Sequence, residues 1–212
     1  MTGRVFLAVA GNIGSGKTTL TRRLSERLGI TAHYEETADN PYLADFYGDM
    51  PRWAMALQLR FLAVRVRRTR ELLGRGVSAI QDRTCYEDAR IFAANLHHRG
   101  DMDPRDWETY RLVADQLLHE LPAPDLLVYL RRDPDSCRTL IAQRGREYEA
   151  SIPMDYLRDL GGRYDGWFDA YTRGPKLYVE AEEHDFLHSE DDLEALVGRI
   201  IEGLPQPSLP LG

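Results

Sequence analysis

Residues 11–18 read GNIGSGKT and decide the fold of this chain. They fit the pattern GxxxxGK[ST], in which backbone N–H groups converge on phosphate oxygens and the following helix adds its positive end. The apolar run 4–10 predicts a strand before the loop, and leucines at every fourth position predict an amphipathic helix over 17–28. This strand–loop–helix context predicts a nucleotide phosphate site. The residues expected to hold the phosphates are Gly11, Asn12, Ile13, Gly14, Ser15, Gly16, Lys17, Thr18 and Thr19.

Two side chains of this loop have chemical roles to fill. Lys17 has the reach to contact the β- and γ-phosphates, and the hydroxyl of Thr18 can bind Mg²⁺. We therefore expect Lys17 to be catalytic, and ATP to be used together with Mg²⁺. The loop does not by itself distinguish kinases from GTPases, ATPases and motors. The guanine signature NKxD is absent and the chain is short, which favours a small-molecule kinase.

The rest of the chain alternates short apolar runs with helical patterns, which is typical of βαβ units around a parallel sheet. We predict an α/β fold of three layers, a P-loop kinase fold whose five-stranded parallel sheet is flanked by helices. One domain is expected over 1–204, with an arginine-rich lid at 138–150 and a frayed tail at 205–212. The other strands are predicted at 31–35, 77–82, 125–131 and 176–180, and the other helices at 52–73, 86–98, 104–120, 135–144, 155–173 and 191–203.

Composition limits the partners and the compartment. The chain has 212 residues and a net charge of −7, which argues against binding of duplex nucleic acid through a basic surface. Cys85 and Cys137 have no metal-type spacing and are expected to be reduced thiols. The apolar run 5–10 is too short to span a membrane, and no export signal is visible. We therefore expect a cytoplasmic protein that binds neither nucleic acid nor membrane.

Charged residues follow two of the predicted strands. Glu35 and Glu36 end the second strand, and Asp82 and Arg83 end the third. Because ligands of open parallel sheets bind at the carboxyl ends of the strands, these side chains face the same crevice as the phosphate loop. Taken singly, each is more often a solvated strand end or a surface ion pair. The surrounding motifs have to decide between these two interpretations.

Five further segments, in this order and spacing, make the chain similar to one family. It resembles the deoxynucleoside kinases of the deoxycytidine, deoxyguanosine and deoxyadenosine kinase type. Its segment after the second strand is compact, and in this respect the chain resembles the bacterial deoxyadenosine/deoxyguanosine kinases. The resemblance runs from about residue 4 to 187. The landmarks beside the phosphate loop are YEETADNPYLADFY (34–47), RWAMALQLRFLAVR (52–65), QDRTCYEDARIFA (81–93), RGREYEASIPMDYL (144–157) and YVEAEEHDF (178–186).

The resemblance implies roles around the acceptor sugar. Glu35 matches the family's catalytic carboxylate, which takes the proton of the 5′-hydroxyl. Arg83 matches the arginine that holds the acceptor oxygen and the phosphate. Tyr47 and Glu149 match residues that bind the 3′-hydroxyl of the sugar. A carboxylate suits the first role because it can accept a hydrogen bond from the hydroxyl and orient it for in-line attack.

The resemblance also implies a metal site and a closing lid. Asp82 matches the acidic residue that binds Mg²⁺ together with Thr18. Arg144 and Arg146 match the lid arginines that contact the phosphates of ATP. Leu140 stands where many relatives carry a further lid arginine, which leaves the contacts of the lid open.

Base recognition is implied at Gln58, Arg65 and Asp88. Gln58 can give a donor and an acceptor to a base edge, although a polar residue on an exposed helix face is the alternative interpretation. Arg65 and Asp88 match an arginine–aspartate pair of relatives that accept purines or cytosine. Trp53 and Phe92 are candidates to flank the base, although aromatic residues at helical spacing are more often plain core.

Together these features predict a kinase that transfers the γ-phosphoryl group of ATP to the 5′-hydroxyl of a deoxynucleoside in nucleotide salvage. Deoxyadenosine or deoxyguanosine is the first expectation, and deoxycytidine is an alternative. A homodimer formed through 52–73 and 104–120 is expected by resemblance, with a heterodimer as the alternative. Two other functions stay open, a nucleoside monophosphate kinase similar to thymidylate kinase and a non-catalytic subunit that binds a nucleotide.

Overall fold

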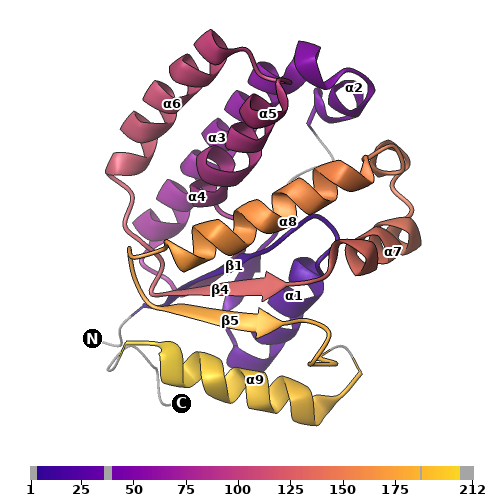
Figure 1. The fold of residues 1–212 in the computed structure, drawn as a ribbon. Coiled ribbons are helices and arrows are strands. Elements are labelled where there is room, and N and C mark those ends of the chain that lie inside the picture. The colour runs from indigo at the N-terminus through magenta and orange to yellow at the C-terminus, as the bar shows by residue number, and fades with distance from the viewer. Residues whose placement is uncertain (1–3, 36–39, 187, 206–212) are drawn as a thin grey trace.

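The sheet at the centre of the molecule has five parallel strands. The computed structural model describes residues 4–35, 40–186 and 188–205, and Figure 1 shows its sheet between two layers of helices. In spatial order the strands are β2 (Thr31–His33), β3 (Ala79–Asp82), β1 (Phe6–Ala10), β4 (Leu126–Arg131) and β5 (Lys176–Glu180). The predicted three-layer α/β fold is confirmed.

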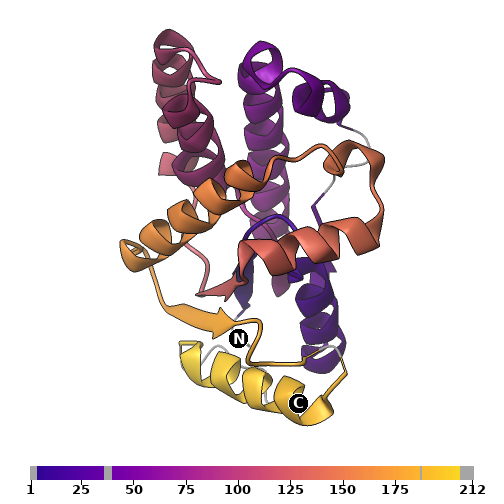
Figure 2. The ribbon, with the colours of Figure 1, turned by 45° about the vertical axis from the view of Figure 1, so that its right-hand side comes forward.

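Helices cover both faces of the sheet. Those on one side are α1 (Lys17–Leu28) and α9 (Glu190–Gly203), and the main ones on the other are α3 (Met50–Arg75), α6 (Pro104–His119) and α8 (Met154–Asp169) (Figures 1 and 2). The period of two along β1 decides which side chain faces which layer. Leu7 and Val9 pack in the cluster with α1 and α9, whereas Ala8 and Ala10 belong to the cluster with α3 and α8.

Aspartates and prolines fix where the longer helices begin. Asp103 accepts a hydrogen bond from the Arg105 N–H at 2.8 Å, and Pro104 occupies the first helical position of α6. Asp133 and Pro134 repeat this arrangement at the start of α7 (Pro134–Arg144). Proline fits there because the first N–H groups of a helix have no partner inside it. These caps place α7 directly after β4, at the end of the sheet where the phosphate loop lies.

The structure differs from the sequence prediction in four places. Strand β2 ends at His33 rather than at residue 35, because the chain leaves the edge of the sheet and Glu35 turns to two arginines. The helix predicted at 86–98 is one helical stretch with a π-helical centre, and two short helices were not predicted. The elements concerned are α4 (Cys85–Glu87), η1 (Asp88–Ala93), α5 (Ala94–Arg99), α2 (Leu43–Gly48) and η2 (Glu147–Glu149). The other elements lie where predicted, with ends shifted by up to four residues.

Two predicted features lie outside the described residues. They are Glu36 and the tail residues 206–212. Within the described part of the chain, no helix has the length and apolar character needed to cross a membrane.

Candidate active site

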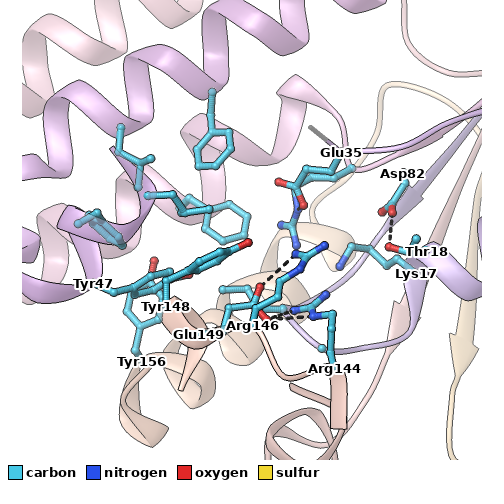
Figure 3. Close-up of a pocket in the computed structure, with 18 of the residues that line it drawn as sticks. Lys17, Thr18, Glu35, Tyr47, Asp82, Arg144, Arg146, Tyr148, Glu149 and Tyr156 are labelled. Carbon is cyan, nitrogen blue, oxygen red and sulfur yellow. Dashed lines mark hydrogen bonds and ion pairs between the residues drawn. The ribbon is translucent and has the colours of Figure 1, made fainter. Parts of the chain in front are cut away.

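A cleft with about 670 Å³ of empty space lies at the carboxyl ends of β1 and β3. Figure 3 shows its two ends, with Lys17, Thr18 and Asp82 on one side and Tyr47 and Tyr156 on the other. A charged end and an aromatic end suit a ligand that carries phosphates next to a ring system. The predicted site residues that line the cleft are Ile13, Gly14, Lys17, Thr18, Glu35, Tyr47, Gln58, Arg65, Asp82, Arg83, Arg144, Arg146 and Glu149.

The phosphate loop wraps tightly against its neighbours. Gly14 has φ +77°, and a Cβ at this position would lie 2.5 Å from the carbonyl oxygen of Cys137. Any other residue would therefore have to move α7. Within the loop, Asn12 donates to the carbonyl of Leu157 at 2.8 Å, which ties the loop to α8.

The predicted residues that do not line the cleft are Gly11, Asn12, Ser15, Gly16, Thr19 and Asp88.

Lys17 points into the charged end of the cleft. Its side chain is buried, and its Nζ donates to the carbonyl of Asn12 at 2.6 Å. Burial and the neighbouring guanidinium of Arg83 lower the pKa of Lys17 to about 8. A bound polyphosphate would restore the charge, because opposite charges favour the protonated amine.

Thr18 and Asp82 form the second pair at this end. The Thr18 hydroxyl donates to Oδ2 of Asp82 at 2.6 Å (Figure 3). The other oxygen of the same carboxylate, Oδ1, is buried and has no hydrogen-bond partner among the described residues. One carboxylate and one hydroxyl beside a phosphate loop fit Mg²⁺, which takes few protein ligands and several phosphate oxygens. The described residues hold no cluster of three His, Cys, Asp or Glu side chains that would suggest another metal.

Glu35 is held between two guanidinium groups. Nε of Arg83 donates to its Oε2 at 3.2 Å, and Nη2 of Arg65 donates to its Oε1. Burial alone would raise the pKa of Glu35, but Arg83, Arg65 and Lys17 outweigh it and lower the pKa to about 2. The carboxylate is therefore ionised at neutral pH and can accept a hydrogen bond from a hydroxyl group.

Arg65 links Glu35 to the predicted base site. It also forms an ion pair with Asp88, whose other oxygen has no partner among the described residues. Gln58 is only 2% exposed, which rules out an exposed helix face, and it lines the cleft with its Oε1 unpartnered in the described part of the chain. Trp53 packs against Tyr42 with the two rings tilted by 37° and does not line the cleft, whereas Phe92 does. The amide oxygen of Gln58 is therefore a group to which a bound ligand would donate a hydrogen bond.

The segment predicted as a lid, residues 138–150, brings three predicted site residues together. Glu149 accepts from Nε of Arg144 at 2.9 Å and from Nη1 of Arg146 at 3.3 Å (Figure 3). Arg138 donates to the carbonyl of Ile152, so it ties the base of the lid to the chain before α8. Both lid arginines therefore neutralise Glu149 in this state and lie at the wall of the cleft.

Two functional candidates were missed by the sequence prediction. Tyr164 accepts a hydrogen bond from Arg83, and Glu87 forms an ion pair with it, both from outside the cleft. Glu87 lies four residues after Arg83, in the short helix α4 that Thr84 caps, and this short separation was the available signal. Tyr164 lies on α8, 81 residues away from Arg83 in the sequence, and no sequence pattern pointed to it.

Comparison with known proteins decides the family. The model of the deoxynucleoside kinase family matches residues 7–204. This chain belongs to the deoxynucleoside kinase family. It is therefore a kinase that phosphorylates deoxynucleosides with ATP, and the two alternative functions are not supported.

Relatives and solved structures agree with the family. A deoxyadenosine/deoxycytidine kinase of Bacillus subtilis is 37% identical over 197 residues, which cover 92% of this chain and 91% of the relative. A deoxyguanosine kinase of Lactobacillus acidophilus is 33% identical over 209 residues, 94% of this chain and 91% of the relative. The structure of deoxyadenosine kinase from M. mycoides with bound dCTP has a TM-score of 0.82 and 25% identity, and covers 93% of this chain and 100% of that chain.

Proposed function

We propose that this kinase phosphorylates the 5′-hydroxyl of a purine deoxynucleoside, deoxyadenosine or deoxyguanosine, in nucleotide salvage, and that deoxycytidine is a weaker acceptor. The observation that carries the base assignment is the buried amide of Gln58 beside the Arg65–Asp88 ion pair. An amide offers a donor and an acceptor at once, which matches a purine edge. Relatives named deoxyadenosine/deoxycytidine kinase and deoxyguanosine kinase support the same substrate class.

The order of groups along the cleft gives the direction of transfer. Lys17 and Gly14 of the phosphate loop bind the phosphates at one end, and Gln58 binds the base at the other. Glu35 lies between them, so it accepts the hydrogen bond of the 5′-hydroxyl and orients its oxygen towards the γ-phosphorus. Arg83, which contacts Glu35, stabilises the charge that develops on the transferred group.

Thr18 and Asp82 are the proposed ligands of Mg²⁺. The unpartnered Oδ1 of Asp82 supports this role, because a buried carboxylate oxygen otherwise has a hydrogen-bond donor. When bound, Mg²⁺ offsets the negative charge of the phosphates of ATP. The hydroxyl of Thr18 is already fixed by its bond to Asp82.

The lid completes the site around the sugar. Tyr47 and Glu149 bind the 3′-hydroxyl, and Arg144 and Arg146 contact phosphate oxygens after they leave Glu149. Tyr47 stacks parallel to Tyr148 with ring centroids 6.3 Å apart, and burial raises the pKa of Tyr47, so its hydroxyl stays a neutral donor. Closure of 138–150 excludes water from the phosphates, which suppresses hydrolysis of ATP.

We further propose a cytoplasmic homodimer that pairs α3 and α6. Leu112 and Val113 on α6 are 59% and 38% exposed, and large apolar side chains of this kind are typically covered in assemblies. Sedimentation of the pure chain tests the dimer. If the pure chain is a monomer and forms a dimer only with an unlike chain, the homodimer proposal is wrong and a heterodimer takes its place.

Steady-state turnover of an acceptor panel tests the function. The acceptors are deoxyadenosine, deoxyguanosine, deoxycytidine, thymidine and dTMP, each with ATP and Mg²⁺. Highest kcat/KM for a purine deoxynucleoside supports the base assignment. Preference for deoxycytidine or thymidine would overturn the base assignment and leave the kinase activity in place, and turnover of dTMP alone would overturn both.

A further inference from the structure

Arg83 is held from the side that faces away from the substrate cleft. Its Nη1 donates to the hydroxyl of Tyr164 at 2.6 Å, and its Nη2 donates to the carbonyl of Gly11 at 3.3 Å. The guanidinium also lies over the ring of Phe92, 4.5 Å from the ring centroid. Only Nε is directed at Glu35, at 3.2 Å. The geometry of the Arg83–Glu35 pair thus depends on Tyr164 and the backbone of Gly11, which do not line the cleft, as well as on Phe92, which does.

Glu87 contacts the surroundings of Arg83 at both its guanidinium group and its backbone. Its Oε2 accepts the hydroxyl hydrogen of Tyr164 at 2.7 Å and lies 3.8 Å from Nη1 of Arg83. Its Oε1 accepts the backbone N–H of Thr84, the next residue after Arg83, at 2.7 Å. One buried carboxylate therefore orients the guanidinium through Tyr164 and the backbone through Thr84.

The backbone at Arg83 needs this support. Arg83 has φ +61°, and no other described residue except glycines has a positive φ. A non-glycine residue in the left-handed region is strained and persists only where the surroundings impose it. The Arg83 N–H donates to the carbonyl of Val9 at 3.0 Å, and the Glu87 bond to Thr84 fixes the following peptide. These two bonds hold the strained turn on both sides.

Charge gives the network a further role. Arg83 is 4% exposed and has two carboxylate neighbours, Glu35 and Glu87. Glu35 lines the cleft, where the acceptor hydroxyl is proposed to bind, whereas Glu87 is fully buried and does not line the cleft. Glu87 is therefore a second acidic partner of Arg83 that lies apart from the cleft, and a buried guanidinium requires such a partner.

We infer that Tyr164 and Glu87 are positioning residues for phosphoryl transfer, which hold the guanidinium of Arg83 in line with Glu35 and the phosphate loop. Neither residue touches the substrate. The inference rests on the proposed role of Arg83 in the reaction, but it does not depend on which base is preferred.

Tyr164→Phe tests the inference, because it removes only the hydroxyl. The ring keeps its parallel stacking on Tyr129, with centroids 5.7 Å apart. We expect kcat to fall about 10- to 100-fold, since small displacements of catalytic groups have effects of this size. KM for ATP and for the acceptor should change less than about threefold, because the binding groups are untouched. The acceptor is whichever deoxynucleoside the wild-type chain turns over best.

Tyr171→Phe is the matched control. Tyr171 is buried in the same way, but its hydroxyl has no hydrogen-bond partner in the described part of the chain, so kcat should not change. Thermal unfolding of both variants separates a loss of folded protein from a loss of turnover. Glu87→Gln provides a second variant, and it should lower kcat while leaving both KM values near those of the wild type.

A double-mutant cycle with Arg83→Lys decides whether the effect passes through Arg83. A lysine has no guanidinium fork to reach Tyr164, so Tyr164→Phe should lower kcat less than about threefold in that background. The inference is overturned if Tyr164→Phe alone leaves kcat within about twofold of wild type. It is also overturned if the same large loss recurs in the Arg83→Lys background. A wild-type chain without turnover of purine deoxynucleosides would instead overturn the proposed base preference.

Discussion

Nε of Arg83 lies 3.2 Å from Oε2 of Glu35 and joins the end of β3 to the segment that follows β2. The contact places the proposed acceptor of the 5′-hydroxyl proton beside the group that stabilises the transferred phosphoryl. Arg83, with Arg65 and Lys17, lowers the pKa of Glu35 to about 2 despite burial, which acts in the opposite direction. A carboxylate of such low basicity orients a hydroxyl group well and removes its proton only as the P–O bond forms.

Substitution of Glu35 should reduce turnover more than binding. We expect Glu35→Gln to lower kcat about 10²- to 10⁴-fold, because the amide cannot take the hydroxyl proton. Glu35→Asp keeps the charge on a shorter side chain and should retain more activity than Glu35→Gln. Steady-state kinetics with ATP and the best acceptor measure both variants. Equal activities of the two variants would contradict a role that depends on the charge.

The acid limb of the rate profile should not come from Glu35. Its folded-state pKa is about 2, so the carboxylate stays ionised above that pH and is protonated only as pH falls through it. We therefore expect kcat/KM of the wild type to be level between about pH 5.5 and 7.5, a window well above this pKa. An ionisation near pH 6 in the kcat/KM profile that shifts in Glu35→Asp would contradict the low pKa of Glu35. An ionisation near pH 6 that does not shift in Glu35→Asp would belong to another group.

Much of the fold was predictable from the phosphate loop and the alternation of strands and helices. Gly16 and Lys17 have fixed places in the loop motif, and the strand before them is apolar throughout, so tertiary contacts had little left to decide. The end of β2 was not predictable, because it depends on the ion pairs that Glu35 forms with Arg65 and Arg83. These two arginines lie 30 and 48 residues after Glu35 in the sequence.

The site was predictable only where local motifs or the family resemblance carried it. Asp82 and Arg83 lie next to each other in one motif, and the structure places both in the cleft. Tyr164 enters the network through α8 packing, which no periodicity reveals. Gln58 was ambiguous as sequence, since burial decides its role and burial depends on the tertiary fold.

Binding of ATP should take up a proton near pH 8. The pKa of Lys17 is lowered to about 8 by burial and Arg83, so the amine is about half protonated at pH 8. Phosphate charges raise that pKa again, and binding should therefore take up about 0.5 proton at pH 8 and almost none at pH 6.5. Calorimetry in buffers of different ionisation enthalpy measures this number.

Lys17→Arg is the control for the proton uptake. An arginine stays charged at both pH values, so any ATP binding that survives should show no uptake assigned to this position. Uptake at pH 8 that persists unchanged in Lys17→Arg would assign the proton to another group.

Removal of the charge at Asp82 should change the dependence on Mg²⁺. We expect Asp82→Asn to raise the free Mg²⁺ concentration for half-maximal rate about tenfold or more, since one of two protein ligands loses its charge. Rates at fixed ATP across a Mg²⁺ series measure the shift. Asp165→Asn is the control, because that carboxylate accepts from the Tyr129 hydroxyl and does not line the cleft. An equal shift in both variants would contradict a specific ligand role.

Gln58→Leu should separate binding from stability. Its Oε1 has no partner in the described residues, so an apolar side chain of similar size should leave the unfolding midpoint unchanged or raise it. KM for the deoxynucleoside should rise about 10- to 100-fold, because the base edge loses its polar partner, while KM for ATP stays near the wild-type value. Thermal unfolding and steady-state kinetics over the acceptor panel measure the two effects separately. An unchanged KM for every acceptor of the panel would remove Gln58 from base recognition.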